Sequence, residues 1–168
     1  LVVPLGDALR LDAETCERLA AFVEGGGRLL TVGQSPLSRA LGIRFAETHV
    51  EVGSITEARA PALAIRWGTA SAFTPFTLPR RGKTFAWAAQ GRHALVSSFR
   101  IGRGTVLFLG VEIADGGDSG SLRFPYLLQA VGEAFGISPP IAVHRMTTYA
   151  DLGDHRDESP LAIARAWY

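Results

Sequence analysis

The side chains that could do chemistry in this sequence are carboxylates that follow an apolar run. Glu112, Asp115 and Asp118 stand in a glycine-rich stretch directly after the apolar segment 105–111. If that segment is a strand, these carboxylates lie at its carboxyl end, where open α/β sheets bind their ligands. They could then hold a calcium ion, a sugar or a partner subunit. A solvated loop that uses Asp and Gly for its turns is the competing interpretation.

A second acidic group lies near the end of the chain and comprises Asp151, Asp154, His155, Asp157 and Glu158. Its spacing does not match the EF-hand pattern, which requires oxygen ligands at alternating positions and a closing Glu. The other histidines are scattered over predicted strands. We therefore expect a charged surface loop here, and we predict no metal ion and no cofactor.

Two side chains could act as nucleophiles, and neither has the surroundings that such a role requires. Cys16, the single cysteine, falls on the apolar stripe of a predicted helix, so we interpret it as a buried structural thiol. A single cysteine also excludes an internal disulfide and a zinc site made of cysteines. Ser35 precedes Pro36, an arrangement that favours a helix cap over a catalytic hydroxyl. The sequence thus predicts no catalytic residue.

The elements that position these side chains begin with a strand, a helix and a strand over the first 33 residues. The apolar run 1–5 predicts a parallel strand covered on both faces. Asp12 is the predicted cap of a helix that ends at three consecutive glycines, and 28–32 returns as a second strand. Such a unit is a βαβ crossover with parallel strands. Its second strand ends at a turn that begins with Gly33, where this kind of fold would hold a nucleophile.

The rest of the chain predicts mostly strands joined by tight turns. A short helix is expected over 36–41 and a longer helix over 124–135, while the wholly apolar segment 105–111 predicts a central strand. Further strands are predicted over 49–55, 62–67, 85–89 and 93–99. The prolines that follow Ser138 indicate a boundary, beyond which we expect a separate tail.

Bulk composition limits the function classes. The 168 residues are enough for one domain or one domain with an appendage, and a hydrophobic fraction of 47% supports a real core. A net charge of +1 does not favour binding to nucleic acid or to an anionic membrane. No apolar run has transmembrane length and no signal peptide is visible. Because the chain starts inside a predicted strand, we expect a piece of a longer protein, and its compartment stays open.

Three segments of the sequence resemble a known family. They are LVVPLGDALRLDAETCERLAAFVEGGGRLLTVG at 1–33, LSRALGIRFAE at 37–47 and GRHALVSSFRIGRGTVLFLGVEI at 91–113, and a predicted helix at 126–135 follows the last of them. Their order and their glycines resemble the class I glutamine amidotransferase-like fold. More narrowly, they are similar to the middle, trimerisation domain of family 42 β-galactosidases and related multidomain glycosidases. All three are packing and turn signatures, which specify a fold better than a function.

The resemblance implies an α/β, flavodoxin-like three-layer domain with a mainly parallel sheet and an antiparallel hairpin extension at one sheet edge. We expect this amidotransferase-like domain to cover residues 1–140, without the first strand and helix of the family. Residues 141–168 would then form a tail that could begin a following β domain.

The residues that an active class I amidotransferase requires are missing. Such an enzyme carries a cysteine in the turn G-x-C-x-G, and a His-x-Glu pair after a late strand. This sequence has no cysteine around Gln34 in the corresponding turn, and no histidine two residues before Glu112. The resemblance therefore implies a scaffold without the family's chemistry.

We accordingly expect a non-catalytic structural and oligomerisation module of a multidomain carbohydrate-active enzyme. The parent chain would be a β-galactosidase-like glycoside hydrolase. The partners of the module would be the other domains of the same chain and further copies of itself, as a homo-oligomer. The carbohydrate substrate would be that of the parent enzyme.

Two alternatives remain open. A ligand-binding domain would use a crevice at the strand ends, lined by Gly33, Gln34, Glu112 and Asp115. A divergent amidotransferase-like hydrolase would need Ser35 or another hydroxyl beside a histidine in the fold. The substrate of the parent enzyme and the number of copies in an assembly cannot be read from the sequence.

Overall fold

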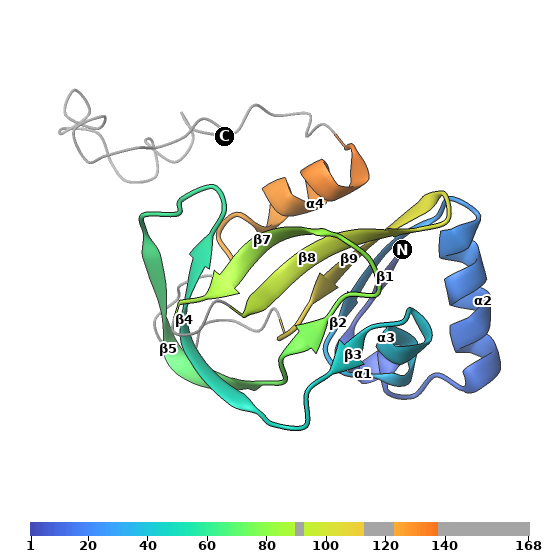
Figure 1. Cartoon of the computed structure of the whole chain (residues 1–168), viewed down its shortest axis with the longest axis horizontal. Coiled ribbons are helices and arrows are strands. Elements are labelled where there is room, and N and C mark those ends of the chain that lie inside the picture. The colour runs from blue at the N-terminus through green and yellow to red at the C-terminus, as the bar shows by residue number, and fades with distance from the viewer. Residues whose placement is uncertain (90–92, 113–122, 138–168) are drawn as a thin grey trace, which may run out of the picture. The chain divides into compact units, whose positions relative to one another are not determined.

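The computed structural model describes residues 1–89, 93–112 and 123–137 (Figure 1). These residues form a seven-stranded sheet with the strand order β1-β2-β9-β8-β7-β4-β5. Its strands are β1 (Val2–Val3), β2 (Arg28–Val32), β4 (Val50–Glu57), β5 (Ala64–Phe73), β7 (Lys83–Ala88), β8 (Ala94–Ile101) and β9 (Gly104–Leu109). A separate two-stranded ladder joins β3 (Arg44–Phe45) to β6 (Phe76–Thr77). The helices are α1 (Leu5–Ala8), α2 (Ala13–Glu24), α3 (Pro36–Ala40) and α4 (Leu127–Phe135).

The sheet confirms the α/β class but is mostly antiparallel. Strands β1, β2 and β9 pair in parallel, whereas β9, β8, β7, β4 and β5 pair antiparallel in that order. The prediction of a mainly parallel sheet was therefore wrong. Parallel neighbours need a long crossover between them, and the described connections among β4, β5, β8 and β9 are instead short turns. The predicted antiparallel extension is present, and it makes up the larger part of a sheet that curls towards β5 (Figure 1).

Strands β2 and β9 are buried on both faces, and their alternating side chains divide the core in two. Leu29 of β2 and Phe108 of β9 pack with residues of α1, α2 and α3. Leu30 and Leu107, one position along each strand, pack with residues of α4 and the antiparallel strands. Figure 1 shows α2 and α4 on different sides of these strands. This double burial explains why both segments are mostly apolar.

The predicted first helix is confirmed in its limits and its cap. The side chain of Asp12 accepts a hydrogen bond of 2.7 Å from the backbone N–H of Thr15, and α2 follows directly. Cys16 and Val23 on its inner face are buried, and burial raises the pKa of the Cys16 thiol. A buried thiol with a raised pKa is a poor nucleophile, which agrees with a structural role.

The first strand is shorter than its apolar run. Strand β1 ends at Val3, Pro4 is the N-cap of α1, and Leu5 already belongs to that helix. Val2 is 63% exposed, so this strand is not covered on both faces by the described residues, contrary to the prediction. Apolar character alone did not distinguish a long buried strand from a short edge strand followed by a helix.

The C-terminal end of α2 is closed by the turn between β8 and β9. The backbone N–H of Arg103 donates to the carbonyl of Glu24 at 3.0 Å, and its guanidinium donates to the carbonyl of Gly25 at 3.1 Å. Gly104 comes so close to the carbonyls of Val23 and Gly27 that a Cβ atom at this position would overlap them. The hairpin can therefore reach the helix only because residue 104 has no side chain.

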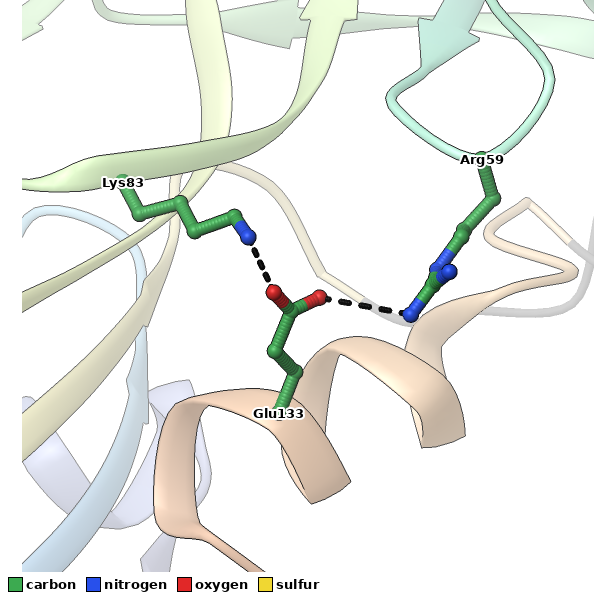
Figure 2. Close-up of polar contacts among 3 residues, drawn as sticks. All are labelled: Arg59, Lys83 and Glu133. Atoms are coloured by element: carbon green, nitrogen blue, oxygen red, sulfur yellow. Dashed lines mark hydrogen bonds and ion pairs between the residues drawn. The ribbon is translucent and has the colours of Figure 1, made fainter.

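Helix α4 is attached to the sheet by polar contacts. It spans Leu127–Phe135, and its C-cap Gly136 has a φ of 60°, which supports the predicted glycine stop. The carboxyl of Glu57, which is 4% exposed, accepts the backbone N–H of Tyr126 at the N-cap at 3.1 Å. Figure 2 shows a second attachment, in which Glu133 of α4 contacts Lys83 of β7 and Arg59 of the β4–β5 turn. Burial raises the pKa of Glu57 to about 7.

Two predictions concern parts of the chain beyond this description. Residues 138–168, which include the predicted tail and the second acidic group, lie outside the described residues. A domain boundary at residue 140 therefore stays a prediction. Among the helices that the structure describes, none has the length and apolar character needed to cross a membrane.

Replacing Gly104 by Ala is expected to lower the free energy of unfolding by about 2 kcal/mol or more, because the new methyl group must displace backbone carbonyls. Chemical denaturation monitored by circular dichroism measures the change. Gly6→Ala is the matched control, since a Cβ at residue 6 meets nothing within 4 Å. A loss below about 0.5 kcal/mol for Gly104→Ala would contradict the tight contact between hairpin and helix.

The buried carboxyl of Glu57 makes stability depend on pH. Because its pKa is higher in the folded chain than the ordinary 4.5, the folded state holds a proton that the unfolded state releases. Stability should therefore fall by about 1–3 kcal/mol as the pH rises from about 5 to about 8. Glu57→Gln should flatten this slope in melting experiments, whereas Glu133→Gln, at a half-exposed position, should retain it. Equal slopes in the wild type and Glu57→Gln would contradict the assignment.

Candidate functional site

The carboxyl ends of the three parallel strands meet at one crevice. Leu5, Gly33 and Gly110 stand in the segments that follow β1, β2 and β9, and all three line a cavity of about 450 Å³. Further lining residues come from the antiparallel part of the chain, among them Ser71 of β5 and Thr74 after it. The cavity therefore lies where an open α/β sheet is expected to bind a ligand, and its size is in the range of small-molecule sites.

The structure brings together three of the four predicted ligand-binding residues. Gly33, Gln34 and Glu112 all line the crevice, with Gly33 buried, Gln34 half-buried and Glu112 exposed. Asp115, like Asp118, lies outside the described residues. The rule that strand ends share one edge thus located this crevice from the sequence. Whether these residues bind anything stays a prediction.

The turn after β2 has no side chain at its sharpest point. Gly33 has a φ of 69°, and its N–H donates to the carbonyl of Leu109 at 2.7 Å. A Cβ atom at this position would come within 2.8 Å of the Leu5 side chain. From the sequence, a nucleophile would be expected in this turn, if anywhere. At its sharpest point the turn has a glycine instead, and the Leu5 side chain fills the space that a side chain would need.

Ser35 is a helix cap, as predicted. Its hydroxyl accepts the N–H of Ser38 at 3.2 Å, and the Ser38 hydroxyl accepts the N–H of Ser35 at 2.8 Å. This reciprocal pair is a capping box at the start of α3. Ser35 is 3% exposed, so its hydroxyl is neither free nor accessible to a substrate.

Arg123 is a crevice residue that the sequence analysis missed. It lines the cavity and is only 9% exposed. Its Nη1 donates to the Ser71 hydroxyl at 2.8 Å, and its guanidinium carbon lies 4.9 Å from the centre of the Trp67 ring. Nothing local in the sequence marks this arginine, because its burial depends on Trp67, which is 56 residues away.

His49 is a further polar residue in the lining of the crevice. Its Nδ1 lies 2.8 Å from the Thr74 hydroxyl, and both residues line the cavity. Glu112 lies in the same lining and forms no ion pair with any residue that the structure describes. The crevice thus combines a buried cation, an exposed carboxylate and neutral hydrogen-bonding groups.

A smaller cavity of about 190 Å³ lies beneath α4 and is lined by Glu57, Arg59, Lys83 and Glu133, among others. Figure 2 shows that Glu133 contacts both Arg59 and Lys83 in this cavity. These contacts attach a helix to the sheet, which is a structural role. Within residues 1–89, 93–112 and 123–137, no three His, Cys, Asp or Glu side chains are grouped so that they could hold a metal ion.

Comparison with known proteins supports the resemblance at the level of the fold. No protein-family profile matches this sequence, and no curated protein matches it either. Solved structures do match. A cold-adapted β-galactosidase from Rahnella sp. R3 is 17% identical with a TM-score of 0.50, and Gan42B, a GH42 β-galactosidase from G. stearothermophilus, is 16% identical with a TM-score of 0.53. Each alignment covers 84% of this chain and 22% of the β-galactosidase.

A cytoplasmic protein from Salmonella typhimurium also matches, with 12% identity, a TM-score of 0.53, and coverage of 77% of this chain and 68% of that one. At such identities the likeness concerns the fold alone. The chain spans about a fifth of the length of the β-galactosidases that it matches, so the comparison concerns one part of those enzymes. The chain therefore has the fold of a domain-sized part of the GH42 β-galactosidases, as its sequence resemblance predicted.

Proposed function

We propose that this chain is a non-catalytic structural and oligomerisation module of a multidomain carbohydrate-active enzyme, with a β-galactosidase-like glycoside hydrolase as the parent. The observation that carries the proposal is the pattern of coverage. The fold matches over 84% of this chain but over only 22% of each β-galactosidase. A segment of that kind serves a larger enzyme, whose catalytic carboxylates would lie in another domain.

The turn after β2 supports a role without catalysis. Gly33 contributes no side chain there, and Ser35 is engaged in a helix cap. A divergent amidotransferase-like hydrolase would require an exposed nucleophile beside a base that a third group orients. The Thr74 hydroxyl lies 2.8 Å from Nδ1 of His49, but no carboxylate among the described residues pairs with this histidine. The hydrolase alternative is therefore not favoured.

The open edge of β1 supports a role in assembly. Among the described strands, β1 pairs with β2 alone, so its outer edge has no strand partner within this part of the chain. Val2 on this strand is 63% exposed, and Leu1 just before it is 59% exposed. An exposed apolar edge strand is a ready surface for a second strand or a neighbouring domain. We propose that other domains of the parent chain and further copies of this module dock here.

A second candidate function is a ligand-binding domain. It is favoured by the crevice of about 450 Å³ that Gly33, Gln34 and Glu112 line together. The two functions are compatible, because the crevice lies at the carboxyl ends of the parallel strands whereas the proposed docking surface is the outer edge of β1.

Light scattering at several concentrations tests the assembly proposal. The chain should show a mass that is a multiple of its 17.9 kDa. Val2→Lys should return it to the monomer, because a lysine on an edge strand opposes pairing with another strand. Leu63→Lys, at a similarly exposed apolar residue in the β4–β5 turn, should leave the mass unchanged. A monomer at every concentration would exclude self-assembly by this module.

A further inference from the structure

The crevice contains a buried positive charge that is not fully satisfied. Arg123 is 9% exposed, and its Nε is buried without a hydrogen-bond acceptor. The ion pairs among the described residues involve Glu133 and not Arg123. Burial of a guanidinium is costly unless an anion and complete hydrogen bonding compensate it. Within the part of the chain that the structure describes, this side chain therefore has one N–H group without an acceptor and no anion to compensate its charge.

The arginine is held in place by contacts on two sides. Ser71 accepts a hydrogen bond from Nη1, and the Trp67 ring lies against the guanidinium. The Trp67 Nε1–H in turn donates to the Arg123 carbonyl at 3.1 Å, so the tryptophan holds both the backbone and the head group. A guanidinium fixed in this way pays little entropy when it binds an anion, and its planar fork matches a carboxylate.

The polar groups around Arg123 define what else the occupant must offer. Gln34 and Thr74 can donate or accept hydrogen bonds, and the exposed Glu112 can accept them. An anion that has no hydrogen-bond donor would be repelled by the Glu112 carboxylate and could not form a hydrogen bond with it. A carboxylate whose molecule also carries hydroxyl groups satisfies Arg123 and Glu112 together.

We propose that the crevice binds a small hydroxylated carboxylate of roughly monosaccharide size. Its carboxylate pairs with Arg123 and its hydroxyl groups face Gln34 and Glu112. The inference rests on the second candidate function, that of a ligand-binding domain, and it adds the chemical class of the ligand. It does not depend on the oligomeric state.

Titration of the whole ¹⁵N-labelled chain with glucuronate, and separately with glucose, tests the proposal by NMR. The two sugars share a ring and differ in the carboxylate. Glucuronate should shift the Nε–H signal of Arg123 and the backbone signals of Gly33 and Gln34, and glucose should bind about tenfold more weakly or not at all. Arg123→Lys should weaken glucuronate binding about tenfold, because a lysine keeps the charge but loses the planar fork.

Two further variants keep the test independent of folding. Arg66→Gln removes a charge from an exposed position on β5 and should leave binding unchanged. Glu112→Gln, also at an exposed position, should leave stability unchanged and weaken glucuronate binding, because the ionised acceptor of the ligand's hydroxyl groups is lost. Unchanged or stronger binding by Glu112→Gln would contradict the placement of the hydroxyl groups near this residue.

The outcomes separate this inference from the function on which it rests. Equal binding of glucose and glucuronate, with shifts at Gly33 and Gln34, would overturn the carboxylate and retain the ligand-binding domain. Failure of both sugars to bind would overturn the inference. If glucuronate bound only to an Asp115→Asn, Asp118→Asn double variant, an acidic side chain of the chain itself would be the partner of Arg123, and the inference would again be wrong.

Discussion

The pairing of β2 with β9 is the contact on which the rest of the structure depends. Five consecutive residue pairs, from Arg28↔Thr105 to Val32↔Leu109, join an early strand to a late one in parallel register. Their alternating side chains supply both halves of the core. The same pairing aligns the ends of the two strands, so Gly33 and Gly110 enter one crevice wall. Helices, hairpin and crevice are all positioned by this central pair.

The elements of the first 33 residues were predictable because their signals are local. The cap at Asp12, the glycine stop and the apolar strand β2 each depend on residues within a few positions of one another. Strand direction was not predictable in this way, because it depends on how distant segments meet. The prediction of a buried strand over residues 1–5 was wrong for a related reason. Apolar residues suit an exposed edge strand, a buried strand or a helix equally well.

The residues of the candidate site were likewise predictable only in part. Gly33, Gln34 and Glu112 could be predicted from a general rule about strand ends. Arg123 could not, because it becomes buried only through Trp67, 56 residues away. Outside the site, the buried Glu57 beneath α4 could not be predicted for the same reason, since its partner Tyr126 is 69 residues away. Charged residues that a fold buries are therefore the part of a site that local sequence patterns describe least well.

The junction between α2 and the β8–β9 turn has a consequence for how the molecule opens. The amide of Arg103 donates to the carbonyl of Glu24, the last residue of the helix, and the amide of Thr105 donates to the carbonyl of Gly27 just beyond it. A hairpin far along the chain thus satisfies the final carbonyl of the helix. Neither element can fray alone without breaking hydrogen bonds of the other. We therefore expect the end of the helix and the hairpin, some 80 residues apart in the chain, to open together, so that their amide protons exchange with solvent at similar rates.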